Sequence, residues 1–211
     1  MGRLVIIIGQ LASGKTTLAD YMVELKGFKR IKTVTTRPMR PGEDDSSYTF
    51  VTKEEFKELL DNDMLAEFTS FAVAGGDTWY YGSPKSEYET DKDVVVVLNP
   101  QGMLMIANQY AHAEVIYLKA DLELLINRGL DRGDNPVELC RRLITDTPLF
   151  EEVEAVGMYS TMYFVEGESA QHIYDTVVDQ EAVDRMVGAL DPDLGLPQMV
   201  PESVLNGGDA E

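Results

Sequence analysis

The chain has 211 residues, enough for one well-buried core with an inserted subdomain but too few for two large independent domains. Its 37 acidic residues outnumber 18 basic ones, and the net charge of −19 argues against binding to nucleic acid or to an anionic membrane. The single cysteine, Cys140, excludes an intrachain disulfide. Since the sequence shows neither a signal peptide nor an apolar stretch that could span a membrane, we expect a cytoplasmic protein with small-molecule partners.

The pattern G-x-x-x-x-G-K-[ST] occurs at residues 9–16, between an apolar run at 4–8 and a helix-like segment at 17–26. In that context it predicts a phosphate-binding loop after a buried strand. The glycines let the backbone curl around an anion, and the peptide N–H groups and Lys15 supply positive charge. The hydroxyl of Thr16 would bind Mg²⁺. We expect a nucleoside triphosphate to be held by Gly9, Gln10, Leu11, Ala12, Ser13, Gly14, Lys15, Thr16 and Thr17.

A cationic loop follows the first helix. Residues 35–43 read TTRPMRPGE, and their two prolines and one glycine favour an extended loop that carries Arg37 and Arg40. Thr52, with Glu55 three residues later, forms a capping box that opens a helix. The expected elements are an extended segment at residues 28–36, strands at 47–51, 65–73 and 78–81, and a helix from 53 to about 61. They predict a small inserted β-rich subdomain.

The middle of the chain alternates strands with helices. After the run at 4–8, residues 93–98 form a second apolar run typical of a strand in a parallel sheet, and residues 114–118 are expected to form a third strand. The expected helices are a short one from residue 83, one ending near 110, one after an N-cap at Asp121 and one at 136–144, with a glycine-broken stretch at 128–136. The alternation predicts an α/β fold with a doubly wound parallel sheet, whose ligands bind at the carboxyl ends of the strands.

The last third of the sequence is less regular. Residues 145–173 show no clean period and are interpreted as helical. A last strand is expected at 174–178 and a last helix at 181–190. Residues 191–211 lack a core pattern and are predicted to form a disordered acidic tail.

Four blocks of the sequence together resemble the guanylate kinase family of P-loop nucleoside monophosphate kinases. They read GQLASGKTT, TTRPMRPGEDDSSYTFVTKEEF, AEFTSF and YYGSPKSEYE, in that order along the chain. The resemblance implies transfer of a phosphoryl group from ATP to GMP or dGMP with Mg²⁺, on a P-loop NTPase-type sheet. It implies a domain at 1–190, with a core at about 1–32, 84–127 and 143–190, a β-rich nucleoside monophosphate-binding subdomain at about 33–83 and a helical lid at about 128–142.

The resemblance also implies roles for individual residues. Glu67 would accept hydrogen bonds from the N1–H and exocyclic amine of guanine, donors that adenine lacks on that edge. The phosphate of the acceptor would be bound by Arg37, Arg40, Tyr48 and Tyr81, with Thr33, Ser83 and Asn99 as further contacts to GMP. The transferring phosphates would be reached by Lys15, Arg37, Arg128, Arg132 and one of Arg141 and Arg142, of which we select Arg142.

The positions of the basic residues support an anion site without reference to the family. Seven of the 18 basic residues fall in three loop or lid segments near proposed strand ends: Lys15, Arg37, Arg40, Arg128, Arg132, Arg141 and Arg142. An acidic chain that collects its cations there is typical of a protein that binds an anion.

The sequence departs from the family pattern in three places. Residues 97–100 read VLNP where the family usually has aspartates, so Asn99 carries no charge. The lid is one residue short, and the spacing from Leu143 to Tyr174 is longer than usual. The alternatives are a related kinase acting on other deoxynucleoside monophosphates or a ribose bisphosphate, or an inactive guanylate kinase-like binding module. The sequence leaves a monomer and a homodimer equally open.

Overall fold

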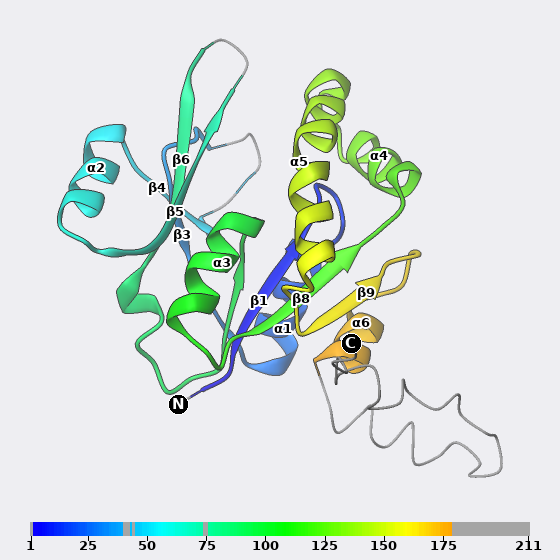
Figure 1. Ribbon diagram of the computed structural model, residues 1–211, viewed down its shortest axis with the longest axis horizontal. Coiled ribbons are helices and arrows are strands. Elements are labelled where there is room, and N and C mark those ends of the chain that lie inside the picture. The colour runs from blue at the N-terminus through cyan, green and yellow to red at the C-terminus, as the bar shows by residue number, and fades with distance from the viewer. Residues whose placement is uncertain (1, 40–42, 44, 74–75, 179–211) are drawn as a thin grey trace, which may run out of the picture.

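The computed structural model describes residues 2–39, 43, 45–73 and 76–178 (Figure 1). Its central sheet has five parallel strands in the order β2 (Lys29–Arg30), β7 (Val94–Val97), β1 (Leu4–Gly9), β8 (Glu114–Lys119) and β9 (Thr161–Phe164). β1 lies at the centre, and all six of its residues are buried, as expected for a strand covered on both faces. The predicted α/β class with a parallel sheet is confirmed.

Helices cover both faces of the central sheet. Alternate residues of β1 belong to two apolar clusters: Val5 and Ile7 face α1 (Lys15–Lys26), α4 (Leu122–Asp131) and α6 (Ala170–Val177), whereas Ile6 and Ile8 face α3 (Pro100–Gln109). The long helix α5 (Pro136–Val156) contributes to both clusters, its first half to one and its second half to the other. The carboxyl ends of β1, β7 and β8 thus meet between two helical layers.

A second sheet lies beside the first (Figure 1). Its strand order is β4 (Tyr48–Phe50), β3 (Thr33–Thr35), β6 (Thr78–Pro84) and β5 (Leu65–Ala72), and it is mixed, because β3 pairs with β4 in parallel and with β6 antiparallel. Helix α2 (Lys53–Asp61) packs Phe56 onto it and begins with the predicted capping box between Thr52 and Glu55. The predicted short helix from residue 83 is only a 3₁₀ turn, η1 (Lys85–Glu87), which follows β6.

The lid segment is more helical than the sequence suggested. A break was predicted at 128–136, but α4 continues to Asp131, so Arg128 and Gly129 are helical. A Cβ on Gly129 would lie 2.7 Å from the side chain of Leu139 on α5. Here glycine allows α4 to approach α5 closely and does not end the helix.

The C-terminal prediction was wrong in two places. The last strand of the central sheet is β9, inside the segment interpreted as helical, and residues 174–177 belong to α6. Ser169 is the N-cap of helix α6, since its hydroxyl accepts a hydrogen bond from the backbone N–H of His172, and the helix buries Ile173 and Tyr174. The expected helix at 181–190 and tail at 191–211 lie outside the described residues. No helix in the described ranges is long and apolar enough to cross a membrane.

Candidate functional site

The loop between β1 and α1 has the backbone of an anion-binding site. Gly9 makes a close approach, because a Cβ there would lie 2.5 Å from the carbonyl oxygen of Leu118, and Gly14 is left-handed with φ 97°. No side chain that the structure describes caps the start of α1, so the first N–H groups of this helix remain available to a ligand. The hydroxyl of Ser13 is fully buried and has no hydrogen-bond partner in the described part of the chain. The loop is therefore suited to an anionic ligand that supplies acceptors.

Lys15 turns back onto this loop. Its Nζ donates to the carbonyl oxygen of Gln10 at 2.7 Å. The pKa of Lys15 is lowered to about 7, mainly by burial and also by the positive charges of Arg142 and Arg132, while the negative charge of Asp146 opposes the change. The side chain amide of Gln10 donates to Thr147 Oγ1 at 3.1 Å and so ties the loop to α5.

A cleft of about 1690 Å³ joins the loop to the second sheet. Elements of both sheets and of the α4–α5 hairpin line it, so segments far apart in the sequence face one volume. Its lining includes these predicted site residues: Gly9, Leu11, Ala12, Ser13, Gly14, Lys15, Thr16, Thr17, Thr33, Arg37, Tyr48, Glu67, Tyr81, Asn99, Arg128, Arg132, Arg141 and Arg142. Gln10 and Ser83 are not part of the lining, and Arg40 lies outside the described residues.

Arg37 is buried at the second-sheet side of the cleft. Its two terminal nitrogens donate to the carboxylate of Glu43 at 2.9 and 2.6 Å, and its guanidinium lies over the rings of Tyr48 and Phe50 at 5.2 and 5.4 Å from the centroids. Such a planar, two-pronged arrangement is the geometry that guanidinium also uses for phosphate. Glu43, which also lines the cleft, was missed by the sequence analysis because nothing in its local pattern indicates this pairing.

Tyr48 and Tyr81 come from β4 and β6 and lie edge to face, with centroids 6.2 Å apart. Burial raises the pKa of Tyr81, so its hydroxyl stays protonated and can donate a hydrogen bond. The two hydroxyl-bearing rings and Arg37 lie on one side of the cleft.

Glu67 on β5 is a buried carboxyl group at the wall of the cleft, 3% exposed. Its Oε1 accepts a hydrogen bond from Ser83 Oγ at 2.9 Å, which places Ser83 behind it. Burial raises the pKa of Glu67 to about 7, although the bonds from Ser83 lower it. A carboxyl group in this environment can ionise when a ligand offers it two hydrogen-bond donors in place of the water that burial excludes.

Asn99 has a structural task. It is the N-cap of α3, and its Oδ1 accepts a hydrogen bond from the backbone N–H of Gly102 at 2.7 Å. An uncharged amide serves this purpose as well as a carboxylate. Any contact of Asn99 with a nucleotide stays a prediction.

The lid arginines differ in their partners. Arg128 lies near the phosphate loop, since its Nη1 is 3.9 Å from an ideal Cβ on Gly14. Arg132 pairs with Asp134, and Arg141 pairs with Glu138 on its own helix. Arg142 lies 3.9 Å from Asp146 and acts electrostatically on Lys15. Of these two neighbours on α5, Arg142 is the one whose charge lowers the pKa of Lys15.

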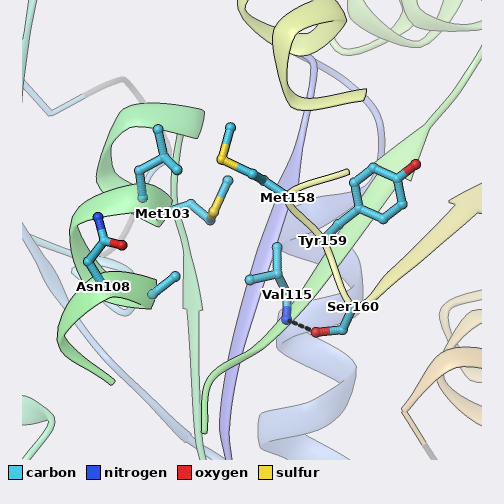
Figure 2. Close-up of a pocket in the computed structure, with 8 residues that line it drawn as sticks. Met103, Asn108, Val115, Met158, Tyr159 and Ser160 are labelled. Atoms are coloured by element: carbon cyan, nitrogen blue, oxygen red, sulfur yellow. Dashed lines mark hydrogen bonds between the residues drawn. The ribbon is translucent and has the colours of Figure 1, made fainter. Parts of the chain in front are cut away.

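A smaller pocket of about 250 Å³ lies elsewhere, between α3 and the segment before β9 (Figure 2). Met103 and Met158 face one another across it, and the backbone N–H of Val115 donates to Ser160 Oγ at 3.0 Å. Its lining contains none of the predicted site residues.

The comparisons with known proteins agree with the motifs. A family model described as guanylate kinase matches residues 1–141. The guanylate kinase of Clostridium tetani is 32% identical over 166 residues, covering 75% of this chain and 76% of that protein, and the one from Symbiobacterium thermophilum is 31% identical over 154 residues, covering 70% and 71%. The crystal structure of guanylate kinase from Anaplasma phagocytophilum has a TM-score of 0.61 at 21% identity, covers 90% of this chain and 88% of that one, and shares the fold. The chain belongs to the guanylate kinase family.

Proposed function

We propose that this protein transfers the γ-phosphoryl group of ATP to GMP or dGMP, giving ADP and the guanine nucleoside diphosphate. The observation that carries the proposal is that the phosphate loop with Lys15 and the pair Arg37 and Glu67 line one cleft. A donor triphosphate at the loop and an acceptor phosphate at Arg37 would then face each other inside it. Family membership and the guanylate kinase relatives support the same reaction.

The chemistry needs no strong general base, because the attacking phosphate oxygen of the acceptor is already anionic. Catalysis then depends on alignment and on neutralising the charge of the moving phosphoryl group. Lys15 and Arg142 would supply that charge from the loop and from α5. A triphosphate beside Lys15 favours its protonated form, and Nζ would exchange the carbonyl oxygen of Gln10 for a phosphate oxygen.

Recognition of the acceptor would divide between its two ends. The phosphate would compete with Glu43 for Arg37 and accept from Tyr48 and Tyr81. The Arg40 contact stays a prediction from the sequence. At the other end, ionised Glu67 would accept from N1–H and the exocyclic amine of guanine, a pair of donors that adenine does not present.

Mg²⁺ is the expected cofactor, bound together with ATP. The donor set fits it: Thr16 lines the cleft, and a hydroxyl oxygen is a ligand that Mg²⁺ uses alongside phosphates and water. No group of three His, Cys, Asp or Glu side chains within the described ranges could hold a metal by itself. The ion would therefore arrive with the nucleotide, and it would neutralise charge on the phosphates.

A panel of ribo- and deoxyribonucleoside monophosphates with ATP and Mg²⁺, followed by coupled ADP release, tests the proposal. GMP and dGMP should be phosphorylated with kcat/KM at least about 100-fold above AMP, because a mismatched donor–acceptor pattern is rejected strongly. A preference for another monophosphate or for a ribose bisphosphate would select the related-kinase alternative. Failure of every acceptor would select a binding module, which the intact loop with Lys15 disfavours.

A further inference from the structure

A chain of three buried side chains leads away from the cleft behind Glu67. Tyr88, in the segment after η1, lies with its hydroxyl 2.7 Å from Ser83 Oγ, and Ser83 Oγ in turn lies 2.9 Å from Glu67 Oε1. Tyr88, Ser83 and Glu67 are 6%, 0% and 3% exposed. These bonds are therefore formed away from bulk water, where a lost partner is costly.

The protonation state of Glu67 sets the direction of these hydrogen bonds. Ser83 has one hydroxyl proton, and when it donates that proton to Glu67 it can only accept from Tyr88. Burial keeps the pKa of the Tyr88 hydroxyl well above its usual range, so this group remains a donor. A protonated Glu67 would instead be able to donate to Ser83 and reverse the order. The Tyr88 proton thus favours the ionised form of Glu67.

The ring of Tyr88 is held firmly in place. It stacks on Tyr110 with centroids 5.1 Å apart and an interplanar angle of 18°, and Tyr110 is the C-cap of α3. The opposite end of α3 meets the other oxygen of Glu67, since a Cβ on Gly102 would lie 2.8 Å from Oε2. One helix therefore contacts the Glu67 carboxyl directly at its N-terminus and supports Tyr88 at its C-terminus.

We propose that Tyr88 is a positioning residue for guanine recognition: through Ser83 it holds Glu67 as an oriented, ionised acceptor that faces the cleft. The inference rests on the proposed function and adds a residue that touches no substrate. Among the described residues, the Glu67 carboxyl has Ser83 on one side, with Tyr88 behind it, and on the other side the start of α3 at Gly102, whose neighbour there is Asn99. Tyr88 is the one among these four that titrates.

The variant Tyr88→Phe keeps the ring and its stacking but removes the hydroxyl group. Tyr110→Phe is the matched control, because the Tyr110 hydroxyl does not take part in the hydrogen bonds that link Tyr88, Ser83 and Glu67. For Tyr88→Phe we expect KM for GMP at pH 7 to rise about 5- to 10-fold, as for one lost buried hydrogen bond, with kcat and KM for ATP within twofold. The pH below which KM for GMP rises should move upward, because Glu67 becomes harder to ionise. Tyr110→Phe should leave this profile unchanged.

A double-mutant cycle separates action through Ser83 from a general packing effect. In a Ser83→Ala background, Tyr88→Phe should cause no further rise of KM, because the link is already broken. An unchanged KM and pH profile in Tyr88→Phe would overturn the inference. The inference would also be overturned if Tyr88→Phe raised KM for GMP by the same factor in the Ser83→Ala background as in the wild type. A fall of kcat together with the melting temperature in Tyr88→Phe would overturn it as well. A wild-type protein that phosphorylates no GMP would overturn the proposed function and this inference with it, whereas an active wild type with an unaffected Tyr88→Phe overturns the inference alone.

Discussion

Lys15 Nζ and the carbonyl oxygen of Gln10 are 2.7 Å apart, so the lysine of the phosphate loop is bonded within the loop itself. With a pKa lowered to about 7 by burial, most of this lysine is neutral at pH 8. A bound triphosphate raises that pKa again, so ATP binding at pH 8 should be accompanied by net proton uptake as Lys15 becomes charged. Calorimetric titrations with ATP in buffers of different ionisation enthalpy measure this uptake. Zero uptake at pH 8 would contradict the lowered pKa.

Replacing Lys15 by alanine should remove charge stabilisation from the donor site only. We expect kcat to fall by about 10³-fold or more, since charge neutralisation dominates phosphoryl transfer. The dissociation constant for GMP should stay within twofold, because the acceptor contacts lie on the second sheet. ADP release and a GMP titration check the two parts. Lys92→Ala, at an exposed position before β7, is the control and should behave as wild type.

Replacing Glu67 by glutamine should damage recognition of guanine selectively. The amide offers one acceptor and one donor where two acceptors are needed, so kcat/KM for GMP should fall at least about 100-fold while that for AMP changes little. In the wild type, KM for GMP should also rise as the pH falls below about 7, because protonation removes the acceptor. Glu67→Gln should lack this pH dependence. A variant that keeps its preference for GMP over AMP would show that Glu67 does not select the base.

Gly102→Ala tests how tightly Glu67 is held. The added Cβ would lie 2.8 Å from Glu67 Oε2, so the carboxyl group must move. KM for GMP should therefore rise about 10-fold, and the melting temperature should fall, because displacing a buried, hydrogen-bonded carboxyl group costs more than the gain of at most about 1 kcal/mol that alanine has over glycine in a helix. Kinetics and thermal unfolding are measured on the same preparation. An unchanged KM would mean that Glu67 can shift without loss of function.

The sequence predicted best what local pattern determines. The loop at residues 9–16, the capping box at Thr52 and the buried strands were readable because spacing and propensity act over a few residues. The acceptor-site residues on and beside the mixed second sheet were grouped by the resemblance to the guanylate kinase family, because no local pattern joins them. Only Arg40 of the expected acceptor contacts falls outside the described residues.

The misses come from contacts that span the chain. β9 is a short edge strand, defined by pairing with β8 more than by its own composition, and α6 carries apolar residues that fit a strand equally well. Gly129 was interpreted as a break because its packing partner, Leu139, lies on another helix. Glu43 and Tyr88 were missed since only the folded chain brings them to Arg37 and Ser83.

In the proposed reaction, one cleft brings ATP and a guanine nucleoside monophosphate together for phosphoryl transfer. Phosphorus NMR of the protein with ATP, GMP and Mg²⁺ follows all products at once. We predict that ADP and GDP appear in equal amounts, with no inorganic phosphate beyond the level without protein. Inorganic phosphate in place of GDP, or unchanged ATP and GMP, would contradict the account.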